Sequence, residues 1–600
     1  MTRLAKWSVP VVAAAGTLAT LPAAAPAGAA PLTESVIVRT APGSTETIEN
    51  FAEALGATVT RELPLIDGFA ARMPTTLVDT LSHHTAVVAV TADAPVRPLT
   101  FTSSLGYDPT RDMGSLSAIT RITGAQDLWK NGITGQGIDV AVIDTGVTPV
   151  AGLTGKVIDG PDLSFDSQEP GLVHLDAYGH GTHMASIIAG NDFATGSSTT
   201  KCTTCLTSSI YSDTTKFVGV APNARIVNVK VGSSDGATDV SQVIAAIDWV
   251  VQHARDPGFN MRVINLSFGT NSLQSYITDP LAFAAEAAWK KGIVVVAAAG
   301  NDGNTTIKSL TSPAYDPMIL AVGADDPMGT LSTSDDVVPT FASHGLPIRP
   351  VDVIAPGTHV LGLNVPGSYV DQTFPTGLVG TRFLRGSGTS QAAAVTSGLV
   401  ALLLQKYPAA TPNEIKSFLK LTATPLDAAK TMRASQYPNV ADLDQVLSSM
   451  GAGVANVSSA SATTITAPTL PSTKEALGTG PIEVTRGNVH VAINGVELVG
   501  EKDIFGKAWN GAVWRPLSTA GRAWTGGTWN GSRWTGDGWT GSRWTDAAWS
   551  GTTWTGSRWS STAWTGNRWT GSRWTGSRWS GSRWSGSRWS GSRWSGAAWA

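Results

Sequence analysis

The feature that most constrains the fold is the alternation of apolar segments with helical periodicity across residues 112–460. Helical segments, including residues 240–254 and 280–291, separate stretches that are apolar on both faces, as strands buried on both sides of a sheet are. The expected strands are residues 138–143, 224–231, 263–266, 293–298, 318–322 and 351–354. This pattern predicts an α/β domain with a parallel sheet covered by helices on both faces. Functional residues are expected at the carboxyl ends of its strands.

Residues 33–95 show a different order of elements. The expected strands and helices follow as βαββαβ, which suits a small α+β domain of the split βαβ type. They are residues 35–40, 45–55, two strands within 57–72 broken near Pro64, 75–82 and 86–91. A Pro-containing stretch at residues 94–109 then reads as a linker.

The first 29 residues have the three-part layout of a secretory signal. Arg3 and Lys6 precede an apolar stretch at residues 9–21, small residues follow, and cleavage after Ala29 fits an A-x-A pattern. The alternative is a membrane anchor, but the stretch is short for a span and Pro-rich sequence follows it. No other window is long and apolar enough to cross a bilayer. We therefore predict a secreted, extracellular protein.

Composition and charge limit the classes of partner that the protein is expected to bind. A chain of 600 residues is expected to hold several domains, and its net charge of −3 argues against nucleic acid or an anionic membrane as the main partner. The only cysteines, Cys202 and Cys205, are two residues apart, and in an exported chain such a pair most simply forms a local disulfide. Half of a zinc site or a redox centre is the alternative.

The C-terminal part divides into three segments. Residues 461–480 read as a linker, and residues 481–505 read as a short β segment with a hairpin around Asn494 and Gly495. Residues 506–600 form a pentad repeat, W-[ST]-G-[ST]-R in its regular part. Two interpretations stay open: the tail binds a cell-wall polysaccharide through exposed Trp and Arg, retaining the protein at the cell surface, or it is a spacer or a stacked solenoid.

Three motifs of the predicted α/β domain carry chemistry when they are taken together. Asp144 follows a buried strand in AVIDTG, His180 opens a helix in GHGTHMASIIAG, and Ser390 ends GSGTS before a helix of small residues. Each alone fits an ordinary turn or helix cap. Together, a hydroxyl that attacks, an imidazole that takes its proton and an acid that orients the imidazole are the parts of an activated serine.

The chain order Asp, His, Ser with these flanking residues resembles the subtilase family of serine peptidases. The resemblance covers about residues 112–460 and implies a subtilisin-like fold, with Asp144 as orienter, His180 as general base and Ser390 as nucleophile. The segment AAAGNDG resembles the family's oxyanion motif and implies that role for Asn301. The residues implied in substrate binding are Ser267, Phe268, Gly269, Ala298, Ala299 and Gly300.

The resemblance also implies how the chain works. Residues 33–95 are similar to the family's inhibitory propeptide, so we expect a self-processing zymogen of a serine endopeptidase that acts on proteins or peptides. The chemistry requires no cofactor; family members often bind calcium, but no ligand set matches here and any metal site is left unassigned. Many relatives have Met after the nucleophile and then Pro, where this chain has Gln391 and Ala394. The rivals are an inactive peptide-binding relative and a cell-surface structural protein whose function lies in the tail.

Overall fold

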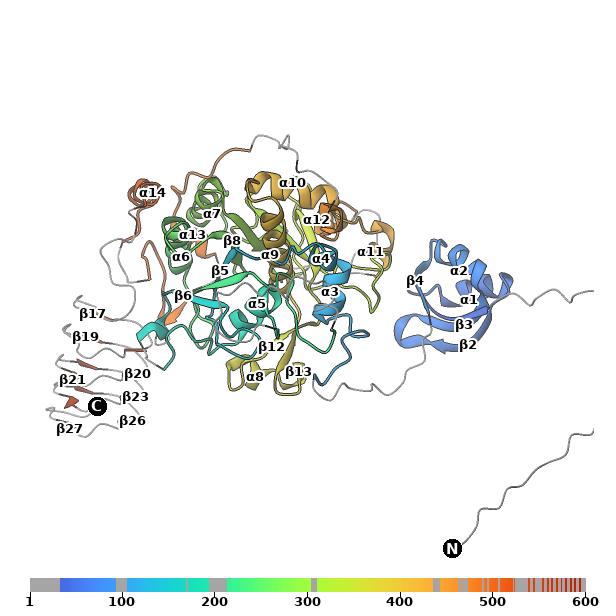
Figure 1. The fold of residues 1–600 in the computed structure, drawn as a ribbon, viewed down its shortest axis with the longest axis horizontal. Coiled ribbons are helices and arrows are strands. Elements are labelled where there is room, and N and C mark those ends of the chain that lie inside the picture. Colours follow the sequence, from blue (N-terminus) through green and yellow to red (C-terminus); the bar gives the residue numbers. More distant parts are fainter. Residues whose placement is uncertain are drawn as a thin grey trace, which may run out of the picture. The chain divides into compact units, whose positions relative to one another are not determined.

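The computed structural model describes two compact units, one within residues 1–94 and one within residues 95–600 (Figure 1). The described residues are 33–92, 105–168, 171–193, 213–303, 310–434, 443–461, 465, 473–487, 490–493, 496–504, 508–521 and 523, with short strands after residue 537. The predicted signal, both cysteines and most of the linker at 94–109 lie outside them.

The first unit is a four-stranded antiparallel sheet with two helices. The strand order is β2-β3-β1-β4, and β1 lies centrally because it pairs with both β3 and β4. Val36, Val38, Ile48 and Phe69 are buried in its own core. The elements follow in the predicted order βαββαβ: β1 Thr33–Thr40, α1 Thr45–Ala54, β2 Thr58–Leu63, β3 Gly68–Pro74, α2 Thr75–Ser82 and β4 Val87–Ala92.

The second unit is built on a seven-stranded parallel sheet of order β11-β10-β9-β8-β5-β7-β6. Its strands are β5 Asp139–Asp144, β6 Val157–Asp162, β7 Arg225–Lys230, β8 Met261–Leu266, β9 Val294–Ala298, β10 Leu320–Asp325 and β11 Val353–Pro356. Six of them coincide with the expected strands. The seventh, β6, lies at the edge of the sheet and contains Gly and Pro, so it lacks the apolar pattern of a central strand.

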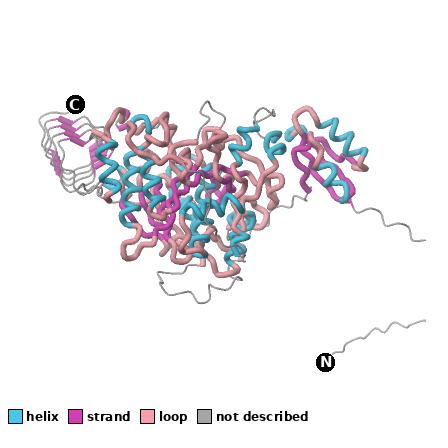
Figure 2. The backbone as a smooth tube through the Cα atoms, turned by 90° about the horizontal axis from the view of Figure 1, so that it is seen from above, coloured by secondary structure: helices cyan, strands magenta, loops and turns pink. Residues whose placement is uncertain are grey.

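Helices cover both faces of this sheet (Figure 2). Helices α5 His180–Ala189 and α9 Thr389–Lys406 pack against each other, and α6 Val240–His253 packs against α7 Pro280–Lys290. The predicted α/β sheet covered on both faces is confirmed.

Smaller elements complete this unit. The short strands β12, β13 and β14 form an antiparallel sheet of order β12-β14-β13. The bounds are α3 Leu116–Ile122, α4 Ala125–Trp129, β12 Val360–Leu363, α8 Tyr369–Thr373, β13 Leu378–Val379, β14 Phe383–Gly386, α10 Pro412–Thr422, α11 Ala428–Ala434 and α12 Leu443–Met450. Within the described ranges, no helix combines the length and the hydrophobicity that a membrane span needs.

The segment after residue 473 packs on the sheet domain. It contains α13 Ile482–Arg486, the hairpin strands β15 Ala492–Ile493 and β16 Val496–Glu497, and α14 Gly511–Thr519. A hairpin was expected between residues 481 and 501, and the structure has a short helix before it. Trp509 and Trp514 begin the Trp pattern of the sequence, yet both are buried in the core of this unit.

The pentad repeat has a coiled backbone. Two-residue strands pair in parallel with strands 15 residues further on, so that three pentads make one turn and three small sheets result. Trp pairs with Trp throughout, as in Trp539 with Trp554. The strands are β17 Gly538–Trp539, β18 Arg543–Trp544, β19 Thr553–Trp554, β20 Arg558–Trp559, β21 Ala563–Trp564, β22 Arg568–Trp569, β23 Arg573–Trp574, β24 Arg578–Trp579, β25 Arg583–Trp584, β26 Arg588–Trp589 and β27 Arg593–Trp594.

Candidate active site

The predicted acid and base are in direct contact. Asp144 ends β5 and His180 begins α5, and the Nδ1 atom of His180 lies 2.8 Å from the Oδ1 atom of Asp144. Gly181 permits this approach, because a Cβ atom there would lie 2.2 Å from the carbonyl oxygen of Gly146 and 3.1 Å from the Cβ atom of Asp144. The glycine after the histidine is therefore required by the close packing of the helix start on the strand end.

A buried polar network fixes the start of α5. Its central residue is Asp176, which the sequence motifs did not predict. Asp176 accepts hydrogen bonds from the backbone of Gly179 (2.6 Å) and Thr182 (2.7 Å), and from the hydroxyl of Thr145 (2.8 Å). That hydroxyl in turn accepts a bond from the backbone N–H of Gly181 (2.9 Å). Asp176 is completely buried, and its position four residues before His180 is the only sequence signal for it.

The two carboxylates determine the protonation of His180. Burial favours the neutral ring and so lowers the pKa of His180, but the charge of Asp144 and its hydrogen bond to Nδ1 act in the opposite direction, and the charge of Asp176 adds to them. The net effect raises the pKa of His180 above its usual value. An imidazolium at this position is thus stabilised, as a general base that must hold a proton requires.

The second histidine of the motif, His183, lacks the contacts that a general base needs. His183 is buried inside α5, and neither of its ring nitrogens has a hydrogen-bond partner among the described residues. Burial, with the neighbouring His180 charge, lowers the pKa of His183 to about 3. Glycines at 362 and 386 make room for its ring, since Cβ atoms there would lie 2.7 Å and 3.1 Å from its nitrogens. His183 is a neutral packing residue.

Ser390 lies in the first turn of α9, with 8% of its surface exposed. A cavity of about 360 Å³ is lined by His180 and by Ser387 and Gln391, which lie on either side of Ser390 in the chain. The backbone oxygen of Ser390 accepts a hydrogen bond from the hydroxyl of Ser267 (3.3 Å). The starts of α5 and α9 thus line one cavity.

Asn301, which follows β9, is held against the start of α9. Its Oδ1 atom accepts hydrogen bonds from the backbone N–H of Thr389 (2.8 Å) and from the Thr389 hydroxyl (3.1 Å). These bonds orient the side-chain amide, because the oxygen is turned toward the helix and the Nδ2 group remains as the donor. Asn301 is exposed. It lies beside Gly388, at the start of the helix that contains Ser390.

The two predicted substrate-binding segments meet at Thr311. Its hydroxyl donates to the backbone oxygens of Ala298 (3.4 Å) and Ala299 (3.2 Å), and a Cβ atom at Gly269 would lie 2.3 Å from it. Residues 267–269 and 298–300 are therefore adjacent, with Phe268 half-buried and Gly300 at a φ of 113°. Thr311 was not predicted from the sequence, where nothing distinguishes it from other threonines.

Two predictions find no site in the described part of the chain. Cys202 and Cys205 fall in the undescribed residues 194–212, so their disulfide stays a prediction. Among the described residues, no group of three or more His, Cys, Asp or Glu side chains is arranged to hold a metal ion. Calcium therefore remains unassigned.

Comparison with known proteins identifies the family. The model of the subtilase family, Peptidase_S8, matches residues 135–453, which is more than half of the chain and includes Asp144, His180, Asn301 and Ser390. The chain belongs to the subtilase family. Residues 135–453 are thus a serine-type peptidase domain, and the subtilase fold predicted from the motifs is confirmed.

Three subtilase relatives illustrate the extent of the similarity. Serine protease AprX of Bacillus subtilis (strain 168) is 34% identical over 51% of this chain and 66% of its own length. Minor extracellular protease Epr of the same strain is 29% identical over 50% of this chain and 37% of its own. Subtilisin DY of Bacillus licheniformis is 31% identical over 50% of this chain and 89% of its own. The chain thus spans 66% of the length of the first relative and 37% of the length of the second.

Proposed function

We propose that this subtilase is a secreted serine endopeptidase made as a self-processing zymogen. The observation that carries the proposal is the 2.8 Å contact between His180 and Asp144 beside a cavity whose wall continues through the residues flanking Ser390. An oriented imidazole next to a hydroxyl at a helix start is the arrangement that activates a serine.

The proposed reaction has two halves. The Ser390 Oγ atom attacks the carbonyl carbon of the scissile bond while Nε2 of His180 takes its proton, and Asp144 holds the Nδ1–H and stabilises the imidazolium. The oxyanion of the tetrahedral intermediate accepts hydrogen bonds from Asn301 Nδ2 and the Ser390 backbone N–H. The C–N bond then breaks as His180 gives its proton to the leaving amine. Water, activated by His180, releases the second product from Ser390.

Substrate binding is proposed at residues 267–269 and 298–300. Backbone groups of these segments would pair with an extended peptide, which explains a broad choice of flexible protein substrates. We further propose that residues 33–95 inhibit the enzyme until self-cleavage between residues 92 and 112, and that residues 1–29 direct export.

The decisive experiment compares the secreted wild-type protein with Ser390→Ala. A fluorophosphonate probe is expected to label only the wild type, and only the wild type is expected to cleave casein and to release residues 33–95. A folded wild-type protein that is neither labelled nor able to cleave casein would contradict the proposal and favour a binding or structural role.

A second function is proposed for the tail, where the coil repeats Trp at the same place in every turn. A regular array of aromatic and cationic residues suits a repetitive partner such as a cell-wall polysaccharide. The test uses the Ser390→Ala chain, with a matched chain that ends after residue 523, in pelleting with cell-wall material. Retention of the longer chain alone supports the proposal, and equal recovery of both in the supernatant contradicts it.

A further inference from the structure

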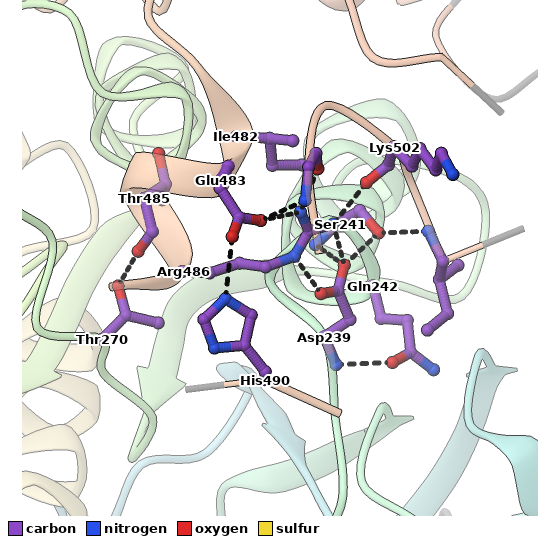
Figure 3. Close-up of polar contacts among 12 residues, drawn as sticks. Asp239, Ser241, Gln242, Thr270, Ile482, Glu483, Thr485, Arg486, His490 and Lys502 are labelled. Carbon is purple, nitrogen blue, oxygen red and sulfur yellow. Dashed lines mark hydrogen bonds and ion pairs between the residues drawn. The ribbon is translucent and has the colours of Figure 1, made fainter. Parts of the chain in front are cut away.

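The segment that follows the peptidase domain returns to it and contacts two of its loops. We call the described residues between 473 and 523 the C-terminal strap. Figure 3 shows its helix α13 next to the start of α6 and to Thr270, with Thr485 beside Thr270 and Arg486 directed toward Asp239. Both Thr485 and Arg486 are completely buried.

The first contact is with the loop after β8. The hydroxyl of Thr270 donates to the backbone oxygen of Thr485, and the backbone N–H of Leu273 donates to the oxygen of Val484 (3.3 Å). The side-chain amide of Gln274 adds bonds to the oxygen of Pro481 (2.9 Å) and the hydroxyl of Thr485 (2.8 Å). Gly487 presses on the same loop, because a Cβ atom there would lie 2.1 Å from the Asn271 oxygen.

The second contact is a buried ion pair with the loop after β7. The guanidinium of Arg486 binds both carboxylate oxygens of Asp239, at 2.7 Å and 3.3 Å. Its remaining donors reach Glu483 (3.1 Å) and the backbone oxygens of Gly500 (2.8 Å) and Lys502. Asp239 is the N-cap of α6, so the pair fixes the point at which that loop enters its helix.

Both loops also contact residues at or close to the active site. The loop after β8 begins with Ser267, whose hydroxyl binds the backbone oxygen of Ser390. The loop after β7 contains Gly236, where a Cβ atom would lie 2.7 Å from the ring of Tyr178, two residues before His180. Two consecutive strap residues, Thr485 and Arg486, therefore contact two loops that also contact Ser390 and Tyr178, close to the nucleophile and the base.

From this arrangement we propose that Thr485 and Arg486 are positioning residues, which hold these two loops in the conformation that binds an extended peptide. The proposal rests on the proposed endopeptidase function. A loop that is already ordered does not pay its ordering cost when substrate binds, so its fixation lowers KM for peptides that span both loops. The strap is thus a part of substrate recognition that lies outside residues 135–453, where the family match ends.

The test compares Thr270→Val, which keeps the shape but removes the hydroxyl, with Thr270→Ser, which keeps the hydroxyl. Active enzyme is counted by titration, so that misfolded protein does not affect the rates. Loss of one such bond is expected to raise KM for a tetrapeptide anilide about three- to tenfold with little change in kcat. The labelling rate of a small fluorophosphonate, which does not reach the loops, is expected to stay unchanged. Thr270→Ser should behave as the wild type.

Arg486→Lys provides a second test, because it keeps the buried positive charge and loses the bidentate contact with Asp239. It is expected to shift the ratio of peptide turnover to fluorophosphonate labelling in the same direction. If titrated Thr270→Val and Arg486→Lys both keep the wild-type ratio, the strap only stabilises the fold and the proposal is wrong. Failure of the endopeptidase proposal itself would look different, since the wild type would then show no labelling at all.

Discussion

The hydrogen bond between Asp144 and His180 sets the lower pH limit at which the enzyme can work. The base must be neutral to accept a proton, and its pKa is raised by the two carboxylates. We therefore expect kcat/KM to fall as the pH drops through a value above 6.5, the ordinary pKa of histidine. In Asp144→Asn this acidic limb should move to lower pH, and kcat should fall on the order of 10⁴-fold.

The pH dependence of kcat/KM on a peptide anilide checks this prediction. The exposed Asp213, whose carboxylate accepts hydrogen bonds from the backbone and hydroxyl of Thr215, provides the control Asp213→Asn, which should leave the limb in place. An acidic limb that stays at the wild-type pH in Asp144→Asn would show that another group controls the profile.

We predict that Gln391 makes the active site more tolerant of peroxide than a methionine would. Its side chain packs against the loop before Ser390, since Cβ atoms at Gly386 and Gly388 would lie 2.3 Å and 2.8 Å from its amide atoms. A thioether at this position would be oxidised to a bulkier, polar sulfoxide next to the nucleophile. Gln391→Met is expected to lose most of its activity in peroxide that leaves the wild type active.

The matched variant for this comparison is Gln391→Leu, which has a similar shape and no sulfur. Residual activity after timed exposure to peroxide is the measurement. If the wild type and Gln391→Leu lose activity as fast as Gln391→Met, oxidation acts elsewhere in the molecule.

At this residue scale, the sequence predicts groups whose neighbours are close in the chain. Asp144, His180 and Ser390 each lie in a short motif that fixes their local conformation. Asp176 and Thr311 have no such motif, because their importance comes from partners that folding brings near, Thr145 for one and the segment 298–300 for the other. The roles of Asn301 and the substrate-binding residues remain predictions that the contacts support.

At the scale of elements, Asp325 at the end of β10 forms a buried carboxyl pair with Asp336 of the segment that follows. Asp325 and Asp336 are buried, and neither has a donor among the described residues except the other. Burial raises the pKa of Asp325, with the Asp336 charge and hydrogen bond adding to it, and burial raises the pKa of Asp336 to about 7. Asp326 and Asp335 add negative charge nearby.

These shifts predict lower stability at alkaline pH. The folded state holds a proton that the unfolded chain releases near pH 4, so the stability is fully present below pH 4 and falls as the pH rises through about 7. Asp336→Asn removes the need for that proton and should gain about 3 kcal/mol relative to wild type at pH 9. Its Tm, measured in the Ser390→Ala background to prevent self-digestion, should exceed the parent's at pH 9. At pH 4 the two should be similar; a Tm lowered equally at both values would contradict the shared proton.

The burial of a helix or strand decides whether it could be predicted from the sequence. Central strands such as β8 and β9 are covered on both faces and are apolar throughout, which makes them recognisable. The edge strand β6 is not, and helix α13 is only five residues long with β-branched residues that favour a strand. Its helical form depends on contacts with α6 and α7, which the local sequence does not encode.

For the whole molecule, the strap extends the core of the peptidase domain to Ala523. Ile482, Trp509 and Trp514 are buried in the core of the peptidase domain. A chain that ends after residue 472 loses their burial and is expected to be less stable by on the order of 5 kcal/mol. A chain that ends after residue 523 should match the full chain. Denaturant unfolding of Ser390→Ala forms measures both, and equal stability of the two truncated chains would show that the strap contributes nothing.

The boundary between the peptidase domain and the repeat could not be predicted from the sequence pattern. The Trp spacing continues smoothly from Trp509 into the repeat, although Trp509 and Trp514 serve the peptidase core. The spacing in the sequence shows where the tryptophans lie along the chain. Only the packing in the structure shows which of them belong to the core of the peptidase domain.

The three-pentad turn has a consequence for how the tail can change over time. Each described strand of the repeat pairs with strands 15 residues before or after it, so the pairing sets no fixed number of units. Because neighbouring pentads are nearly identical, gain or loss of one pentad shifts every later unit by one side of the coil and still pairs Trp with Trp. The reach of the tail can thus vary in five-residue steps while the enzyme before it stays the same.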